Sequence, residues 1–266
     1  MTTTPPNSLT HDQIRNFSPS PNCLDGKTIL VTGAGDGIGQ EVAMTYVKYG
    51  ATVLLLGRTT SKLETVSDDI TQAGGQPPAV ITMDLETASQ AEMQDLASRI
   101  EQDYGKIDGL LHNAGILGDI TPLAEYDLST FERVMRINFT SNFMLTQALL
   151  PLLKRSDNGS VIFTTSSVGS KPRALWGAYA LSKQGVEGMS EIFTQETAKT
   201  TENKDKNLRF NCINPGGTRT DMRAKAYPDE NPSRLKTPAD IMAGYVCLMS
   251  DASIDVRGQV VDLQPK

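Results

Sequence analysis

Cysteine and histidine are scarce in this chain of 266 residues. The three cysteines, Cys23, Cys212 and Cys247, are an odd number at wide spacing. The two histidines, His11 and His112, lie far apart as well. Disulfide frameworks and Cys/His zinc sites need these residues at close, recurring spacings. The sequence therefore suggests neither, and we expect no metal site.

Positive charge and long apolar runs are also lacking. The 25 lysines and arginines are outnumbered by 31 acidic residues, for a net charge of -6, and they form no basic cluster. Nucleic acids and anionic membranes bind concentrated positive charge, so we exclude both as main partners. No run approaches the ~18 apolar residues of a membrane span, and the first residues lack the basic and apolar regions of a secretory signal. With so few cysteines, the expected compartment is the cytoplasm.

The chain does have enough apolar residues for a sizeable core. Hydrophobic residues make up 38% and charged residues 21%, which indicates a folded globular protein rather than a disordered one. An α/β fold of this length commonly remains a single domain. Residues 1–25 differ, because they hold four prolines and many Ser, Thr and Asn residues. We expect this segment to be a flexible N-terminal arm that forms no core.

From residue 26 to 266, short β-branched or leucine-rich runs alternate with longer stretches of helical period. We expect strands over Thr28–Val31, Thr52–Leu56, Ala79–Met83, Gly109–Leu111, Ser160–Thr165 and Arg209–Ile213. The helices are expected over Ile38–Tyr49, Ser61–Ala73, Ala88–Tyr104, Phe131–Lys154 and Trp176–Lys199. Such alternation predicts right-handed βαβ units, and hence one α/β domain with a doubly wound parallel sheet.

The segment Arg219–Pro238 breaks this alternation. It contains three prolines and mixed charge, so it is too polar for a core strand and too long for a simple turn. Long connections of this kind in a compact domain are commonly functional, and we expect a mobile lid here.

A glycine-rich turn, Thr32–Gly39, follows the first strand and runs into the first helix. Glycine lets the chain turn tightly and lets backbone approach a pyrophosphate, which the free N–H groups of the helix N-terminus would bind. Glycine also serves as ordinary turn punctuation. The position between strand and helix in the first βαβ unit favours a dinucleotide site.

Polar residues follow several further strands, where a doubly wound sheet opens its ligand crevice. Arg58 follows the second strand, Asp84 and Leu85 the third, and His112–Gly115 the fourth. Each alone is explained by a solvated strand end. Their recurrence at one edge of the sheet favours a ligand.

Tyr179 and Lys183 lie four residues apart in a predicted helix and share one of its faces. An ammonium group and a nicotinamide charge would lower the pKa of the tyrosine from about 10, which makes it a candidate general acid or base. Such pairs are common on solvated helices, so the spacing alone proves little. Ser166, after the fifth strand, can hydrogen-bond a substrate oxygen. Serine hydrolase chemistry is disfavoured because neither histidine is placed for a triad.

Taken together, these motifs resemble the short-chain dehydrogenase/reductase superfamily in its single-domain branch. The motif set comprises Thr32-Gly33-x3-Gly37-Ile38-Gly39, Asn113-Ala114-Gly115, Asn138, Ser166, Tyr179-x3-Lys183 and Asn214-Pro215-Gly216. The similarity extends from about residue 26 to the C-terminus. More narrowly, the stretches HNAGILGD, WGAYALSK and CINPGGTRT resemble the bacterial YciK-like oxidoreductases.

The resemblance implies a Rossmann-like sheet and hydride transfer between nicotinamide and a carbonyl or alcohol carbon. It implies that Tyr179 is the acid/base, that Lys183 lowers its pKa and binds the nicotinamide ribose, and that Ser166 orients the substrate oxygen. Asn138 would hold a water that connects Lys183 to solvent. The candidate cofactor-binding residues are Gly33, Asp36, Gly37, Ile38, Gly39, Arg58, Asp84, Leu85, Asn113, Ala114, Gly115, Tyr179, Lys183, Pro215, Gly216, Thr218 and Thr220.

NADP(H) is expected to be preferred over NAD(H). A preference for NAD needs a carboxylate at the end of the second strand, where Gly57 stands instead. The neighbouring Arg58 can bind a 2′-phosphate with charge-assisted hydrogen bonds. Asp36 opposes this preference, because some NADP-dependent relatives carry a basic residue at its position.

The resemblance leaves the substrate and the assembly open. Trp176, Arg173 and the lid are candidates to line the substrate pocket. Arg219, Arg223 and Lys225 either bind an anionic group or are solvated charges. Gly185 and Gly188 are costly inside a helix, and close packing between subunits would explain them, so we expect a homodimer or homotetramer.

The sequence therefore predicts an NADP(H)-dependent oxidoreductase acting on a small carbonyl or alcohol substrate, with Tyr179 as general acid/base. An alternative is a cofactor-sensing or scaffolding protein without turnover. The combination of Asn138, Ser166, Tyr179 and Lys183 argues against that alternative. Epimerase or dehydratase chemistry is disfavoured by the glycine spacing and by the lack of a second domain.

Overall fold

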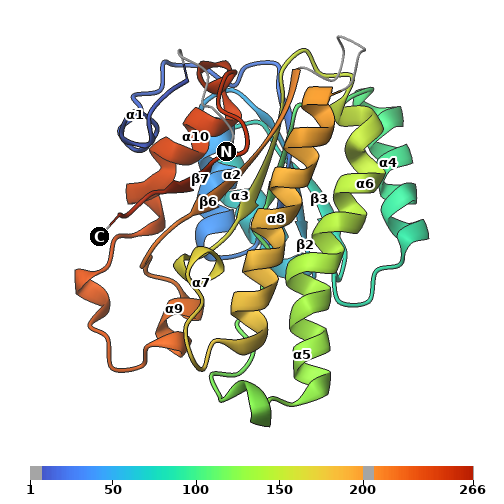
Figure 1. The fold of residues 1–266 in the computed structure, drawn as a ribbon. Coiled ribbons are helices and arrows are strands. Elements are labelled where there is room, and N and C mark those ends of the chain that lie inside the picture. Colours follow the sequence, from blue (N-terminus) through green and yellow to red (C-terminus); the bar gives the residue numbers. More distant parts are fainter. Residues whose placement is uncertain (1–7, 200–206, 266) are drawn as a thin grey trace.

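A single parallel sheet of seven strands lies at the centre of the structure, a computed structural model that describes residues 8–199 and 207–265 (Figure 1). The strands are β1 (Thr28–Thr32), β2 (Thr52–Gly57), β3 (Ala79–Thr82), β4 (Gly109–His112), β5 (Gly159–Thr164), β6 (Leu208–Asn214) and β7 (Val260–Asp262). Their order is β3-β2-β1-β4-β5-β6-β7, and every pairing is parallel. The predicted doubly wound α/β sheet is confirmed.

Strands β1 and β4 mark the point where the strand order reverses. Strand β1 pairs with β2 on one side and with β4 on the other. The loops after β1 and β4 therefore diverge to opposite faces and leave a crevice at the carboxyl ends of the strands. Strand β7 was not predicted from the sequence, because its three residues are too few to show a period.

Helices cover both faces of the sheet and enclose a core on each (Figure 1). One face carries α2 (Gly37–Lys48), α3 (Thr60–Gln72) and α10 (Met242–Met249), and the other carries α4 (Gln90–Tyr104), α6 (Ser141–Leu153) and α8 (Gly177–Lys199). Shorter helices are α1 (His11–Arg15), α5 (Leu128–Met135), α7 (Ser167–Ser170) and α9 (Asp221–Ala226). Within the described residues, no helix is long and apolar enough to span a membrane.

The long helix predicted over Phe131–Lys154 is interrupted in its middle. A five-residue π-helix, η2 (Arg136–Thr140), separates α5 from α6. Such wider turns are rare and are often found at functional sites. This one contains Asn138, whose side chain is fully buried.

The prediction of an N-terminal arm that forms no core is wrong over residues 8–25. Helix α1 begins with a capping box formed by Thr10 and Gln13. Ile14 and Leu24 are fully buried in the core beside α10, and Arg15 Nη1 donates a 3.0 Å hydrogen bond to the Asp262 carbonyl. A few apolar residues between the prolines are enough to anchor the segment. Residues 1–7 of the predicted arm lie outside the described residues.

The predicted lid contains regular structure and is anchored at both ends. Helix α9 and a 3₁₀ turn at Pro232–Arg234 occupy it. Arg219 N donates a 2.8 Å hydrogen bond to Lys236 O, and Thr218 forms an isolated parallel bridge with Lys236. The segment is therefore a loop closed at its base, and its mobility stays a prediction.

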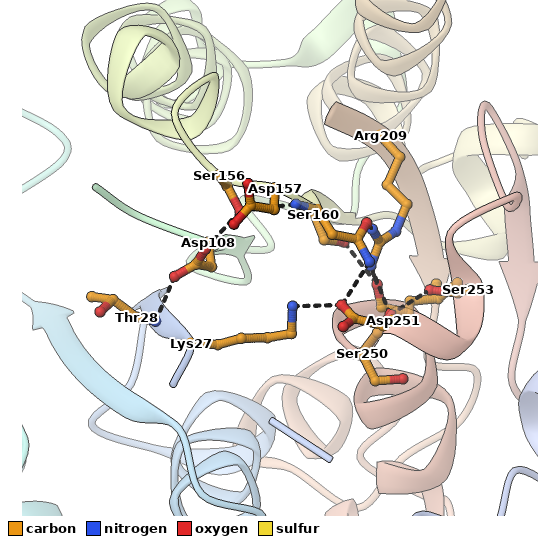
Figure 2. Close-up of polar contacts among 12 residues, drawn as sticks. Lys27, Thr28, Asp108, Ser156, Asp157, Ser160, Arg209, Ser250, Asp251 and Ser253 are labelled. Carbon is orange, nitrogen blue, oxygen red and sulfur yellow. Dashed lines mark hydrogen bonds and ion pairs between the residues drawn. The ribbon is translucent and has the colours of Figure 1, made fainter. Parts of the chain in front are cut away.

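At the amino ends of the strands, buried Arg209 joins β6 to β5 and α10 (Figure 2). Its Nη2 donates to the carbonyls of Ser250, at 2.8 Å, and Leu248, at 3.2 Å, and its Nη1 donates to Asn158 Oδ1. Asn158 Nδ2 in turn donates to Asp251 Oδ1 at 2.6 Å. The guanidinium thus closes the end of α10, where backbone carbonyls lack helical partners.

Two carboxylates extend this polar layer to β1 and β4 (Figure 2). Asp251 Oδ1 accepts from Lys27 Nζ at 2.7 Å. Asp108 accepts from Ser156 Oγ at 2.6 Å and from the Thr28 amide at 3.1 Å. The amino edge of the sheet is therefore connected across four strands by charged side chains with partners in the protein itself.

Candidate active site

A cavity of about 610 Å³ opens at the carboxyl ends of the strands, on the opposite edge of the sheet. The predicted site residues that line it are Gly33, Asp36, Gly37, Ile38, Arg58, Asp84, Leu85, Asn113, Ala114, Gly115, Ser166, Tyr179, Lys183, Pro215, Gly216, Thr218 and Thr220. Gly39 and Asn138 do not line the cavity and lie behind its wall. Residues spread over most of the sequence thus meet at one place.

The glycine turn has the conformation that its sequence requires. Gly33 and Gly37 have φ angles of 66° and 53°, in the left-handed region that favours glycine. A Cβ on Gly33 would lie 2.9 Å from Ala114 Cα, and one on Gly39 would overlap the Gly33 carbonyl. The turn therefore brings backbone to the cavity surface and places the N-terminus of α2 beside it, as an anionic ligand would need.

The residues after β4 hold this turn in place. Thr32 Oγ1 accepts hydrogen bonds from the amides of Asn113, at 3.0 Å, and Ala114, at 3.1 Å. Asn113 Nδ2 donates to the carbonyls of Thr32, at 3.3 Å, and Gly33, at 3.4 Å. The motif after β4 thus has two roles, because it holds the glycine turn by hydrogen bonds and also lines the cavity.

Two basic side chains lie at the end of the cavity beside β2. Arg58 is exposed and has no ion pair or hydrogen bond with any described residue. Lys62, on the first turn of α3, forms a 2.6 Å ion pair with Asp36 of the glycine turn. Lys62 was not predicted from the sequence, although its place four residues after Arg58 at the start of a helix was a usable signal. Because Lys62 compensates the charge of Asp36, that carboxylate opposes a phosphate less than its sequence position suggests.

Ser166, Tyr179 and Lys183 meet at the centre of the cavity. Ser166 precedes α7, at the end of β5, and Tyr179 and Lys183 lie on the first turns of α8. Ser166 and Tyr179 both line the cavity, and the Ser166 side chain acts to lower the pKa of Tyr179. Lys183 Nζ donates to the Thr164 carbonyl at 2.7 Å and lies 5.7 Å from the centroid of the Tyr179 ring.

Burial dominates the ionisation of this group. It raises the pKa of Tyr179 to about 12, although the Ser166 side chain works in the other direction. Burial lowers the pKa of Lys183 to about 8, because a buried ammonium loses its hydration. The sequence predicts a lowered pKa for Tyr179 when a nicotinamide charge lies beside it as well as an ammonium group, and that expectation stays a prediction. In the chain by itself, loss of hydration is the largest influence on the pKa of this phenol and raises it.

Asn138 connects the π-helix to the wall of the cavity. Its Oδ1 accepts from the Ile116 amide at 2.8 Å, and its Nδ2 donates to Ile116 O at 2.9 Å and Ser182 Oγ at 3.1 Å. A Cβ on Gly115 would lie 3.2 Å from Asn138 Oδ1 and 3.6 Å from Lys183 Nζ. Asn138 thus lies next to the lysine without contacting the cavity, and its link to a water stays a prediction.

His112 takes no part in this group. Its ring stacks on Phe163 at 4.8 Å, and its Nε2 is 2.8 Å from Thr146 Oγ1. Burial lowers its pKa to about 3, so the imidazole is neutral near pH 7. Among the described residues, no cluster of three or more His, Cys, Asp or Glu side chains could hold a metal ion.

The C-terminal segment also reaches the site, which the sequence did not predict. Gln264 Nε2 donates to the Pro215 carbonyl at 2.8 Å and to Thr218 Oγ1 at 3.1 Å. Gly216 has a φ of 71°, and a Cβ there would clash with the Gln264 side chain. Gln264 therefore fixes the turn after β6.

The outer half of the cavity is lined by Ile116, Leu117, Trp176, Met222, Arg223, Lys225 and Tyr227. Of the residues proposed for the substrate pocket, Arg173 and Arg219 do not line the cavity. Arg223 is held by two 2.6 Å contacts with Glu230. These residues come from the loop after β4, from the position before α8, and from α9 with the position after it, so only the folded chain brings them together.

The structure thus brings the glycine turn and Ser166, Tyr179 and Lys183 together in one cavity of a doubly wound sheet, which is the arrangement that the sequence motifs predicted. In agreement, the family model described as short chain dehydrogenase matches residues 27–231. The chain belongs to this family of oxidoreductases, as the sequence motifs predicted. A curated relative, the uncharacterized oxidoreductase YciK of Escherichia coli K12, is 50% identical over 250 residues, which cover 94% of this chain and 96% of the relative.

Two solved structures are similar over nearly the whole chain. A short chain dehydrogenase from Shigella flexneri, complexed with NADP, has 51% identity and a TM-score of 0.88, covering 92% of this chain and 100% of its own. One from Escherichia coli CFT073, complexed with NADPH, has 51% identity and a TM-score of 0.89, covering 93% of this chain and 100% of its own. These relatives confirm the predicted YciK-like resemblance and the Rossmann-like fold.

Proposed function

We propose that this protein is an NADP(H)-dependent oxidoreductase that transfers a hydride between nicotinamide and a carbonyl or alcohol carbon, with Tyr179 as general acid/base. The observation that carries the proposal is the convergence of Ser166, Tyr179 and Lys183 on the cavity that the glycine turn opens. Phosphate-binding backbone and a proton donor therefore face the same space.

The residues present fit a dinucleotide with a 2′-phosphate. The close approach of Gly33 to Ala114 leaves no room for a side chain on Gly33, so backbone alone borders the cavity at the turn where a pyrophosphate would bind. Beyond it, Arg58 has no partner among the described residues, and Gly57 supplies no carboxylate for a ribose 2′-OH. Two relatives of about half-identical sequence bind NADP or NADPH. Lys62 is the second cation within reach of this end of the cavity.

Cofactor choice is tested by titrating NADPH and NADH separately. We expect roughly 10- to 100-fold tighter binding of NADPH, since a hydrogen bond to a charged group is worth about 1.5–3 kcal/mol. The double variant Gly57→Asp, Arg58→Ala should reverse the order, because it supplies a carboxylate and removes the free guanidinium. Tighter binding of NADH by the unaltered protein would contradict the proposal.

The bound cofactor supplies the hydride and its two electrons to the carbonyl carbon. Tyr179 donates its phenolic proton to the carbonyl oxygen, which completes the alcohol. Ser166 holds that oxygen by a hydrogen bond before and during the transfer. Lys183 places its charge beside the phenolate that forms, and so reduces the cost of ionising a buried tyrosine. Asn138 keeps Lys183 and the loop after β4 in register through its contacts with Ile116 and Ser182.

The alternative is a protein that binds NADPH for sensing or assembly and does not turn it over. A panel of aldehydes and ketones, incubated with NADPH and the full chain, separates the two. The proposed function predicts loss of NADPH absorbance with formation of one alcohol per NADPH. Saturable NADPH binding without alcohol from any member of the panel would favour the sensor.

We also propose that the segment Arg219–Pro238 acts as a lid. Its helix α9 presents Met222 and Ala226 to the cavity, and Thr220 caps that helix at the cavity edge. Ligand contacts on this side would stabilise the segment against local unfolding. Limited proteolysis between Arg219 and Lys236 should therefore be slower with NADPH than without it.

A homodimer or homotetramer remains our proposal, with its basis revised. Gly185 packs against Phe139 of the same chain, where a Cβ would lie 3.0 Å from the ring. The interface argument therefore rests on Gly188, which faces open space, and on exposed Leu181 and Ile192 of the same helix. Light scattering of the purified chain tests this assembly. The cytoplasmic location stays a prediction.

A further inference from the structure

We propose that the substrate is an uncharged carbonyl compound whose C=O is carried on a flat aromatic or conjugated ring, and that Trp176 and Tyr227 recognise the ring. The inference rests on the proposed function, because it assigns the substrate class of the same site. Trp176 and Tyr227 both line the cavity and come from segments about fifty residues apart. They are specificity-determining residues and have no part in the proton transfer.

The two rings form one continuous aromatic wall. The centroids of Trp176 and Tyr227 are 5.7 Å apart with an interplanar angle of 39°. Nothing of ring thickness fits between them, so a ligand contacts the wall from the cavity side. The ring centroid of Trp176 also lies 5.9 Å from that of Tyr179. The wall therefore leads directly to the proton donor, and a carbonyl one bond from a flat ring would reach Tyr179 while the ring stacks.

Both rings are held in place by the protein itself. Leu175, directly before Trp176, has a φ of 74°, an unusual value for a bulky residue, and its carbonyl accepts from the Thr121 amide at 3.1 Å. The guanidinium carbons of Arg173 and Arg223 lie 5.7 Å and 3.8 Å from the ring centroids of Trp176 and Tyr227 respectively. These contacts preorganise the wall and reduce the ordering cost of binding.

The remaining outer wall offers apolar surface and little charge for a ligand. Ile116, Leu117 and Met222 line it. Arg223 is already neutralised by Glu230 through both carboxylate oxygens. Lys225 has no partner among the described residues, and its side chain is exposed to solvent. Of the three charges considered from the sequence, Arg223 is paired, Arg219 does not line the cavity, and Lys225 lines it without a partner among the described residues. The uncharged class therefore rests on the two rings and the apolar side chains of this wall, and an anionic analogue tests Lys225.

The test uses two ketones of similar size, phenyl methyl ketone and cyclohexyl methyl ketone, with the NADP⁺-loaded full chain. Trp176 is the only tryptophan of the sequence, so its fluorescence reports on the wall directly. We expect saturable quenching by the phenyl ketone, with a dissociation constant about 3- to 10-fold below that of the cyclohexyl ketone, from the gain of an aromatic pair. Equal constants, or no saturable quenching by the phenyl ketone, would overturn the inference.

Variants separate ring recognition from general packing. Tyr227→Leu keeps bulk and Trp176 fluorescence but removes one ring, and it should abolish most of the phenyl preference while leaving the cyclohexyl constant within about twofold. Tyr104→Leu, at the end of α4 and outside the cavity, is the matched control and should change neither constant. If Tyr227→Leu kept the preference for the phenyl ketone, recognition of the ring by Tyr227 would be contradicted.

The same samples keep this inference distinct from the proposed function. Quenching by the phenyl ketone without NADPH oxidation would contradict hydride transfer and leave ring recognition standing. Oxidation of NADPH at equal efficiency with both ketones would support hydride transfer and contradict ring recognition. A para-carboxylate on the phenyl ketone should not tighten binding, and tighter binding would contradict the uncharged class.

Discussion

The two ends of the sheet carry similar polar chemistry and arrange it in opposite ways. At the amino end, Arg209 and Asp108 are buried, and protein groups pair with both (Figure 2). At the carboxyl end, Arg58 has no partner in the described chain, and Tyr179 and Lys183 face a cavity. Polar groups satisfied within the protein contribute to stability. Groups left for a ligand contribute to function.

The difference lies in the segments that adjoin each end of the strands. At the amino end, the end of α10 and the turn after α6 close over the polar layer and supply carbonyls and carboxylates. At the carboxyl end, the connections diverge at the β1–β4 reversal and leave space between them. The comparison predicts that substitutions at one end change turnover and that substitutions at the other change folding.

The largest expected effect is at the carboxyl end. Tyr179→Phe removes the phenol proposed as proton donor, which lines the cavity together with Ser166 and Lys183, and it should lower turnover about 10²- to 10⁴-fold. NADPH binding and the free energy of unfolding should change little. Steady-state kinetics on any accepted ketone measure this, with Tyr104→Phe as the exposed control. Near wild-type turnover in Tyr179→Phe would remove the general acid assignment.

Arg209→Met tests the amino end. The substitution removes three hydrogen bonds of a buried guanidinium and leaves the Asn158 amide oxygen without a donor among the described residues, whereas Leu248 O keeps Ser160 Oγ and Ser250 O keeps Ser253. We expect a loss of about 3 kcal/mol in unfolding free energy. Urea unfolding at constant slope measures it. Arg99→Met, an exposed arginine on α4, should cost less than about 0.5 kcal/mol. Equal stability of the two variants would contradict the claim that the paired polar groups at the amino end of the sheet stabilise the fold.

The burial of Lys183 should make the free energy of unfolding depend on pH in the alkaline range. Its pKa is lowered to about 8 in the folded protein from an ordinary 10.5, so the unfolded chain binds more protons between these values. Wild-type stability should therefore rise relative to Lys183→Met from pH 7 to 10, by on the order of 2 kcal/mol.

The pKa of Tyr179 is about 12 in the folded protein, and removing a neighbouring cation can only raise it. Folded Tyr179 therefore stays protonated up to pH 10 in both proteins, and its titration cancels from this difference. Lys171→Met, which alters an exposed lysine without a partner among the described residues, should run parallel to wild type. If the stability of Lys183→Met changed with pH in parallel with that of the wild type, burial would not lower the pKa of Lys183.

The smallest effect concerns the half-exposed pair Asp36–Lys62. Ion pairs of this exposure contribute at most about 1 kcal/mol, so Lys62→Met should weaken NADPH binding only about 2- to 5-fold. NADH binding should stay unchanged, because it lacks the 2′-phosphate. Asp36→Asn should have the opposite effect and tighten the binding of NADPH. Titration of both cofactors checks the two signs, and equal losses for NADPH and NADH would remove Lys62 from the phosphate site.

Most elements of the fold could be predicted because their signals are local. Strands such as β1 and β2 are continuous apolar runs, and α3 and α4 show a clear helical period. The π-turn at Asn138 could not be seen, since one extra residue per turn leaves the apolar pattern nearly unchanged. The packing of Ile14 and Leu24 was missed because composition averages over a segment, while two well-placed apolar side chains suffice to anchor it.

The sequence by itself determined the α/β alternation, the glycine turn and the family motifs, because each depends on residues close together in the chain. Only the tertiary structure decided that Lys62 pairs with Asp36, that Gln264 holds the turn after β6, and that Trp176 meets Tyr227. It also determined that burial raises the pKa of Tyr179 in the chain by itself. Contacts and desolvation depend on which distant segments pack around a group, and spacing along the chain does not carry that information.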